Sequence, residues 1–276
     1  MTTNARVPWA APLFAIAVAS AAPVAAQPAS SFPEGLQAHG AGGAITIACG
    51  AKYRGTSATL PAASIRGFSG CASACGDMAC TASGKPSMPL PAAPFQVSSG
   101  TNDVAVPAGA TMTLAAGDYR SVNVGPGATL NMPSRTPVRI RTLSLGRNST
   151  VNWQAGDHWI QTLTQFGPQG TFNAVSKGTT RIFVRDPVTL TDPVAWNVQS
   201  QPARMLLRFD GPFQLRAAGP STIHAVIYSA DAISLSQADV TGAVAGSTVA
   251  IDARTTITHD PTAVESLDFG AFLKGP

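Results

Sequence analysis

The side chains that could carry out acid–base chemistry are few in this sequence. Glycoside hydrolysis needs two carboxyl groups held about 5–9.5 Å apart. The chain has 12 Asp and two Glu, and both Glu34 and Glu265 lie outside its repetitive part. Asp118 and Asp157 recur in the same Gly-Asp-aromatic setting, where a short carboxylate is expected to hydrogen-bond the backbone of a turn. The sequence therefore predicts no hydrolytic pair.

Other catalytic groups are not indicated either. The string Gly67-Phe-Ser-Gly70 lacks the spacing and the strand–turn–helix setting of a nucleophile elbow. His259 and Asp260 close the last repeat, where a capping hydrogen bond is expected rather than a catalytic dyad. We expect no metal and no cofactor, because the histidines show no zinc-ligand spacing; they are His39, His158, His224 and His259.

The four cysteines cluster in the N-terminal third of the chain, at Cys49, Cys71, Cys75 and Cys80. Four cysteines allow three pairings, among which the sequence cannot choose. A zinc site is the alternative, but the spacings do not form paired CxxC knuckles. We therefore expect two disulfides that close a loop-rich region in an oxidising compartment.

A possible binding feature is a column of arginines. Arg120, Arg141, Arg185 and Arg208 each precede an apolar pair of the repeat described below, with Gln161 in the same column. Such a row would contact an acidic glycan, whereas nucleic acid is not an expected partner. Local ion pairing competes with this hypothesis, because acidic residues lie within two positions of three of these arginines: Asp118, Asp186 and Asp210.

The composition determines which elements can position these residues. Only 12% of the residues are charged, and the chain holds 26 Gly and 22 Pro. The hydrophobic fraction of 45% excludes general disorder, which needs low hydrophobicity and high net charge. The sparse charge excludes a coiled coil, and the absence of a Gly-x-y period excludes collagen. A turn-rich β protein is expected.

The first residues resemble a secretory signal peptide. Arg6 is followed by the apolar run 7–22 and by small residues that end at Ala26, the order typical of an export signal with its cleavage site. A retained membrane anchor is the alternative, but the run is shorter than the about 20 residues that a span needs. We expect residues 1–26 to be removed and the protein to reach the periplasm, the cell surface or the medium, with no membrane span.

An internal repeat of about 20 residues runs from about position 111 to 260 and predicts a solenoid. Each copy has a pair of apolar residues two positions apart, followed by a turn and a second short strand. The pairs are Val122/Val124, Leu143/Leu145, Val188/Leu190, Phe213/Leu215, Ile233/Leu235 and Val249/Ile251. Residues at i and i+2 share one strand face, so stacked copies bury a continuous core. We expect an all-β, single-stranded parallel β-solenoid (β-helix) of about seven coils; a β-sandwich is the alternative.

Four segments follow from these patterns. Residues 1–26 are the signal peptide, and residues 27–100 are a disulfide-containing, loop-rich region that ends in a Pro-rich extended linker. Residues 101–262 form the solenoid domain. Residues 263–276 form a C-terminal cap or tail, in which Val264, Leu267 and Phe272 would cover the last coil.

Two groups of motifs resemble a known family. The first comprises Leu114–Tyr119, Leu143–Val151, Gly156–Ile160 and Thr180–Val184, and the second comprises the closing segments Ile223–Ser229, Gly242–Ser247 and Thr256–Asp260. Together they resemble the N-terminal repeat region of MshQ-like proteins. These proteins serve the biogenesis of mannose-sensitive haemagglutinin (type IV) pili, and related bacterial surface proteins share the region. The resemblance runs from about Cys71 to Asp260. It implies an exported, non-enzymatic surface or pilus-associated protein; family members usually carry further domains after this region.

The expected function is therefore that of a structural or adhesion-type protein, with pilus or cell-envelope proteins or acidic glycans as partners. A polysaccharide-binding or polysaccharide-degrading β-helix protein is the alternative. An ice- or mineral-binding solenoid would need a regular threonine ladder, and the threonines of this sequence are interrupted by other residues.

Overall fold

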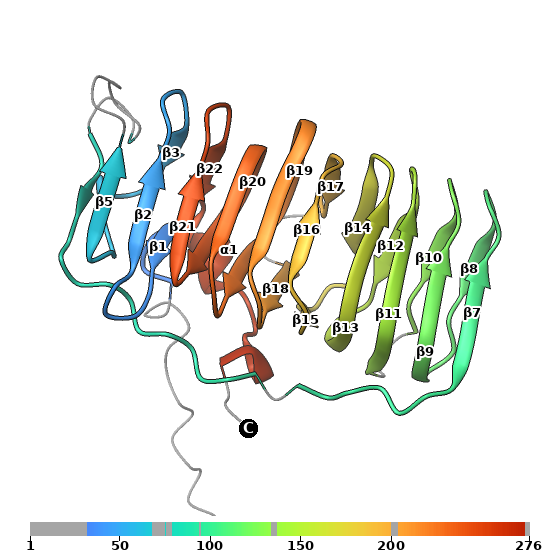
Figure 1. Ribbon diagram of the computed structural model, residues 1–276. Coiled ribbons are helices and arrows are strands. Elements are labelled where there is room, and N and C mark those ends of the chain that lie inside the picture. Colours follow the sequence, from blue (N-terminus) through green and yellow to red (C-terminus); the bar gives the residue numbers. More distant parts are fainter. Residues whose placement is uncertain are drawn as a thin grey trace, which may run out of the picture.

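The computed structural model describes residues 32–67, 75, 79–93, 95–133, 137–199 and 204–273. The expected signal peptide lies outside these residues. The described chain forms a parallel β-solenoid of about nine turns, with its coils stacked side by side along one axis (Figure 1). The predicted fold class is confirmed, although about seven coils were expected.

Each full turn contributes three strand stretches, one more than the two expected, so the solenoid has three faces. One is named the covered face here. It consists of β1 (Leu36–Ala38), β15 (Thr180–Val184), β18 (Met205–Phe209), the first halves of β9 (Gly117–Val124), β11 (Val138–Gly146) and β13 (Gly156–Phe166), and the last parts of β19 (Phe213–Ser229) and β20 (Ile233–Gly246).

The front face lies toward the viewer in Figure 1. It consists of β2 (Ala44–Ile47), β5 (Ser64–Gly67), β7 (Asn102–Val106), β16 (Val188–Leu190), β21 (Thr248–Ile251), the second halves of β9, β11 and β13, and the first parts of β19 and β20.

The ladder face comprises β3 (Lys52–Arg54), β8 (Thr111–Thr113), β10 (Thr129–Asn131), β12 (Thr150–Trp153), β14 (Gly170–Ala174), β17 (Val194–Trp196), β22 (Thr256–His259) and the middle parts of β19 and β20. The remaining elements are a two-stranded sheet of β4 (Thr59–Leu60) and β6 (Thr81–Ala82), the helix α1 (Pro261–Glu265) and the 3-10 turn η2 (Gly270–Leu273).

The core is built from stacked apolar columns, as the repeat predicts. Leu143 pairs in register with Val122 on one side and with Leu163 on the other. Every residue of the six predicted apolar pairs is at most 2% exposed. Columns of like residues also bring aromatic rings together, so Phe172 stacks on Trp196 with ring centroids 5.1 Å apart. Burial of such side chains contributes about 1.5–3 kcal/mol each.

The N-terminal strands extend the C-terminal end of the solenoid. Strand β1 pairs with β20, β2 with β21 and β3 with β22, and β5 adds to β2. Residues 27–100 are therefore not a separate loop-rich region before the solenoid, because residues 36–67 supply coils of it. These strands, together with β7 and β8 at the opposite end of the stack, account for the turns beyond the expected seven.

The sequence predicts that the C-terminal residues cover the last coil, and this prediction is wrong. Strands β1, β2 and β3 occupy that position. After the last coil, Asp260 caps α1 by accepting a hydrogen bond from the Ala263 N–H at 2.9 Å. Val264 and Phe272 are then buried against the side of the solenoid. We name residues 261–273 the tail.

Between β6 and β7 the chain runs along the full length of the solenoid, from the β5 end to the β7 end (Figure 1). We name this segment, residues 83–101, the strap; its described residues, 83–93 and 95–101, contain no regular helix or strand. The Leu90 N–H donates to the Tyr228 hydroxyl at 2.9 Å, and the Ser98 hydroxyl donates to the Tyr119 carbonyl at 2.7 Å. The Ser87 N–H also donates to the Ala38 carbonyl of β1 at 3.0 Å, so the strap is fixed at both ends of the coil stack.

The cysteines form disulfides in the part of the chain next to β3. Cys75 is bonded to Cys80, and Cys49 is also disulfide-bonded, whereas Cys71 lies outside the described residues. Cys75 forms an isolated parallel bridge with Tyr53. The disulfides therefore close the irregular chain at the β5 end of the solenoid.

Candidate interaction surfaces

The covered face carries a row of large side chains that point outward. Trp159, Phe183, Arg208 and Tyr228 are partners in register on successive coils. Trp159 and Phe183 stack with ring centroids 5.7 Å apart. Each of these four side chains is at most 4% exposed, because the tail and the strap lie over them.

The tail covers this row with its own apolar residues. Phe269 and Phe272 are 3% and 0% exposed, and Phe272 contacts the rings of Phe183 and Tyr228 at centroid distances of 6.2 and 6.3 Å. Together with the row they form a second hydrophobic core outside the coils. This face is therefore not available to a partner while the tail is in place.

Arg208 is part of this second core and not of a surface column. Its guanidinium donates to the carbonyls of Phe272 and Pro91, which joins tail and strap to the coil. It also lies 5.3 Å from the centroid of the Tyr228 ring. Burial lowers the pKa of Arg208 and raises the pKa of the neighbouring Asp210 carboxyl. The expected exposure of Arg208 is wrong.

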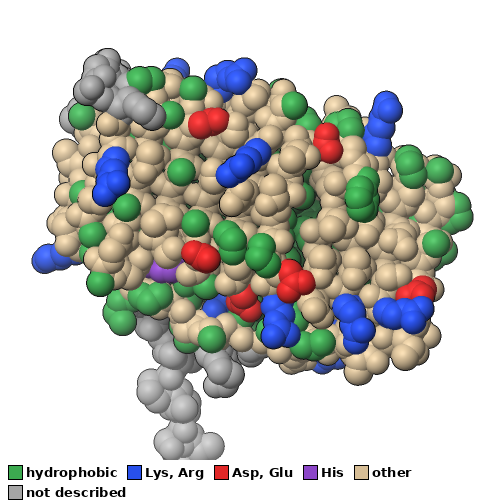
Figure 2. All heavy atoms as spheres, in the orientation of Figure 1, with side chains coloured by type: hydrophobic (Ala, Val, Ile, Leu, Met, Phe, Trp, Pro, Cys, Tyr) green, Lys and Arg blue, Asp and Glu red, His purple; other side chains and the backbone are tan. Residues whose placement is uncertain are grey.

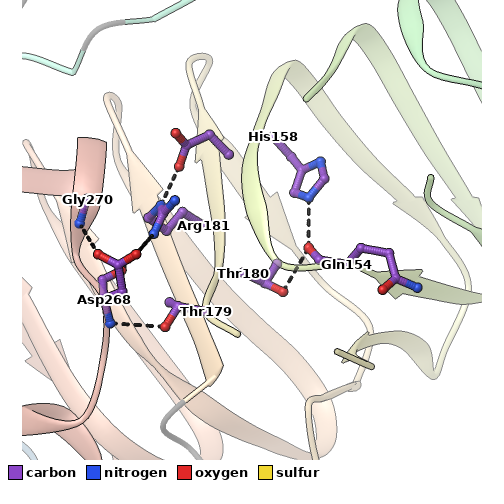
Figure 3. Close-up of polar contacts among 8 residues, drawn as sticks. Gln154, His158, Thr179, Thr180, Arg181, Asp268 and Gly270 are labelled. Atoms are coloured by element: carbon purple, nitrogen blue, oxygen red, sulfur yellow. Dashed lines mark hydrogen bonds and ion pairs between the residues drawn. The ribbon is translucent and has the colours of Figure 1, made fainter. Parts of the chain in front are cut away.

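A polar contact holds the tail at Asp268, directly before Phe269 (Figure 3). The Arg181 guanidinium donates to the Asp268 carboxylate at 3.0 Å and to the Asp268 carbonyl at 2.9 Å. The Asp268 N–H donates to the Thr179 hydroxyl at 3.0 Å. Gly270 follows, and a Cβ there would lie 2.8 Å from the Arg181 guanidinium carbon. Arg181 also pairs with Asp157, so Asp157 binds an arginine of the next coil rather than a turn.

The other predicted arginines lie at the corner between the covered and front faces. Arg120 and Arg141 occupy equivalent positions, because the residues on each side of them pair in register. Gln161 follows in the same way, and the Arg185 N–H donates to the Ile160 carbonyl at 3.1 Å. The next position is occupied by Asp210, whose N–H donates to the Val184 carbonyl. The column therefore has three arginines and ends at an acid.

These three arginines are exposed but differ in their contacts. Arg120 pairs with Asp103, and that pairing lowers the pKa of Asp103 to about 2. Arg185 lies over the Phe95 ring at 5.6 Å, while Arg141 has no ion pair among the described residues. Figure 2 shows basic groups along the lower edge of the β9–β13 side, next to acidic ones. This edge is a weak candidate for an acidic polymer, because neighbouring carboxylates offset part of its charge.

Asp118 is a further carboxylate whose charge is paired with that of a nearby arginine. Its carboxylate lies 3.1 Å from the Arg139 guanidinium, and the Ser99 hydroxyl of the strap donates to it at 3.1 Å. These partners lower the pKa of Asp118 against the opposing effect of desolvation. The expected role in a turn is thus replaced by an ion pair between coils.

The ladder face carries two columns of small polar side chains that point outward. In one column, Thr111, Thr129, Thr150 and Thr171 are partners in register, followed by Ala195 and then Thr222. In the other column the Asn152 amide donates to Asn131 at 2.8 Å, and the Asn173 amide donates to Asn152 at 3.1 Å. These threonine and asparagine side chains are exposed or half-buried. The face is polar, nearly uncharged over β8–β17, and open.

A hollow of about 470 Å³ interrupts the threonine column where Ala195 replaces threonine. It is lined by amide, hydroxyl and apolar groups: Asn148, Gln169, Thr171, Pro193, Val194, Ala195, Pro220 and Thr222. The sequence showed the threonines before the buried residues of each second strand. It did not show that they form one column, because that depends on the register between coils.

A buried polar cluster joins the first coil to the last. The Tyr53 hydroxyl donates to Glu34 at 2.7 Å and accepts from the Gly35 N–H at 3.1 Å. The His259 ring lies 3.9 Å from the same carboxylate, and its desolvation lowers its pKa. A Cβ at Gly35 would lie 2.5 Å from the His259 Cβ, so only glycine allows this approach. The cluster fixes the N-terminal strands on the last coil.

Two further observations concern the described residues only. None of their His, Cys, Asp and Glu side chains form a group of three or more that could hold a metal ion. No helix in the described ranges has the length and apolar character needed to cross a bilayer.

Comparison with protein-family models, with curated proteins and with solved structures finds no match to this chain.

Proposed function

We propose that this chain is an exported, non-enzymatic adhesion-type protein of the bacterial surface or cell envelope. The observation that carries the proposal is the self-closed solenoid. The first strands complete the last coils, the strap runs along all of them, and the tail seals one face. The solenoid with its strap and tail is one stiff body, and it presents the same small polar groups on successive coils. Repeated weak contacts of this kind give avidity to an extended partner.

The cysteines and the resemblance to MshQ-like proteins support this proposal. Disulfides at Cys75–Cys80 and at Cys49 fit an oxidising compartment, in agreement with the signal peptide expected from residues 1–26. Pilus or cell-envelope proteins are the proposed partners. A polysaccharide-degrading enzyme is the weaker alternative, because Asp103, Asp118 and Asp157 are engaged by arginines.

The test uses bacteria that produce the full chain and the purified protein without residues 1–26. We expect the protein in the envelope or surface fraction, accessible to protease added to intact cells. The purified protein should release no reducing ends or unsaturated products from a panel of polysaccharides. Cytoplasmic location, or product release from any polymer of the panel, would overturn the proposal.

A further inference from the structure

The hollow on the ladder face has the chemistry of a carbohydrate subsite. Its rim offers the hydroxyls of Thr171 and Thr222 and the amides of Asn148 and Gln169, while Pro193 and Ala195 supply apolar surface. A sugar ring has this same pairing, with C–H groups on its faces and hydroxyls on its edge. The volume of about 470 Å³ lies within the range of about 300–1,000 Å³ typical of small-molecule sites.

The backbone that carries the rim amides is held before any ligand arrives. Asn148 and Gln169 have φ angles of 55° and 63°, a left-handed conformation that tertiary contacts must maintain. The Asn148 N–H donates to the Pro168 carbonyl at 2.9 Å, and the Gln169 N–H donates to the Pro193 carbonyl at 2.8 Å. A backbone fixed in this way loses little conformational entropy on binding, which favours affinity, although the exposed side chains of Asn148 and Gln169 must still be ordered by the ligand.

Charge separates this site from the arginine corner. Among the described residues no ionisable side chain lines the hollow, whereas Arg120, Arg141 and Arg185 all lie on a different edge of the solenoid. Burying an uncompensated charge in such a hollow would be costly. The lining therefore favours a neutral occupant over an acidic glycan.

The surroundings indicate a chain rather than a single sugar. The hollow is open to the threonine and asparagine columns, which continue over Thr150 and Asn152 at the coil spacing of about 4.8 Å. A flat crystal surface such as ice would not enter the depression at Ala195. We propose that the ladder face binds a neutral polysaccharide, with one sugar seated in the hollow. This inference rests on the proposed adhesive function and names its ligand class.

The experiment measures binding of neutral oligosaccharides (gluco-, xylo- and manno-oligomers of three to six units) and of acidic oligogalacturonates by isothermal calorimetry. Ala195→Phe fills the hollow from a half-buried, outward-pointing position. Thr189→Phe is the control, because it places a ring on the front face, where the exposed Thr189 points outward between the buried Val188 and Leu190. We expect at least one neutral series to bind, with affinity falling about tenfold or more in Ala195→Phe and by less than about twofold in Thr189→Phe.

Three results would overturn the inference: no neutral series binds, the two variants bind alike, or only the acidic oligomers bind. Ice shaping without sugar binding would overturn it as well. Circular dichroism of both variants shows that they keep the solenoid. If the protein remains at the cell surface and neutral sugars do not bind, the inference fails and the proposed function stands. If the bound sugar is cleaved, the site stands and the proposed function fails.

Discussion

The covered face and the ladder face share one backbone pattern but differ in what their outward columns carry. Trp159, Phe183 and Tyr228 belong to a column of large side chains that the tail covers, with Arg208 between the last two, whereas Thr129 and Thr150 belong to a polar column that stays open. In a parallel solenoid each residue lies above its equivalent in the next coil, so a column can keep one character over several coils. The tail and the strap, which do not belong to the repeat, cover one face and leave the ladder face accessible to a partner.

The largest expected effect comes from breaking the cover. Phe272→Ala removes a fully buried ring that touches Phe183 and Tyr228. Truncation of such a ring costs about 3–5 kcal/mol of the free energy of unfolding, measured by urea denaturation. Hydrogen exchange of residues 261–273 should rise at the same time. A loss below about 1 kcal/mol would show that the tail does not hold the covered face.

The next effect separates the two kinds of arginine. Arg208→Met leaves the carbonyls of Phe272 and Pro91 without their charged donor, which should cost about 1.5–3 kcal/mol of unfolding free energy. Arg185→Met is the control, because Arg185 is exposed and such surface changes stay within about 0.5 kcal/mol. Equal losses in the two variants would contradict the assignment of Arg208 to the second core.

A smaller effect is expected from acid, through histidines that the fold keeps neutral. Desolvation lowers the pKa of His39, His158 and His259 below the ordinary value of 6.5. As the pH falls below about 6.5, the unfolded chain therefore takes up protons that the folded chain does not, and stability decreases. Above that pH neither state binds these protons, so this contribution is complete and constant.

Denaturation midpoints between pH 8 and pH 5 check this sign. They should be flat near pH 8 and fall toward pH 5. His158→Gln keeps a polar group near the Gln154 carbonyl, which the His158 ring contacts at 2.9 Å, but it does not titrate, so it should flatten the decline. Stability that rises toward pH 5 would contradict the burial of neutral histidines.

The coils were predictable because their signal is local. Apolar residues two apart, repeated about every 20 residues, determine both the strand and its inward face, and pairs such as Leu143/Leu145 are buried as expected. Asn148 lies in a turn with a φ of 55°, the left-handed conformation that asparagine tolerates better than most residues. These features depend on a few neighbouring residues, so one sequence suffices.

The contacts between distant segments were not predictable in this way. Nothing in the run Ala44–Ile47 specifies that it pairs with Thr248–Ile251 across 200 residues. Arg208 was placed in the surface column because it precedes an apolar pair. However, Phe213 is five residues after it, whereas Leu143 is two residues after Arg141, and that difference moves Arg208 onto the covered face. The hollow likewise depends on register between coils.

On the ladder face, removing one amide should have a modest effect. Asn152→Ala breaks the hydrogen bonds with Asn131 and Asn173, and we expect a loss of about 1 kcal/mol or less of unfolding free energy, since the side chains are half-buried. Thr150→Ala on the same strand is the matched control and should lose less. A loss approaching that of Arg208→Met would show that the ladder face is as structural as the covered face.

The smallest effect on stability is expected for the double variant Arg141→Ser, Arg185→Ser. This variant also tests whether the arginine corner binds an acidic polymer. Both side chains are exposed, so unfolding free energy should change by less than about 0.5 kcal/mol. If the corner holds an acidic polymer, elution from an immobilised polygalacturonate column should move to lower salt, because released counterions set the salt dependence. The matched control is Arg254→Ser, which also removes an exposed positive charge but lies away from this corner, in the turn between β21 and β22. Unchanged elution of the double variant would remove the corner from the candidate surfaces and leave the ladder face as the only open one proposed to bind a glycan.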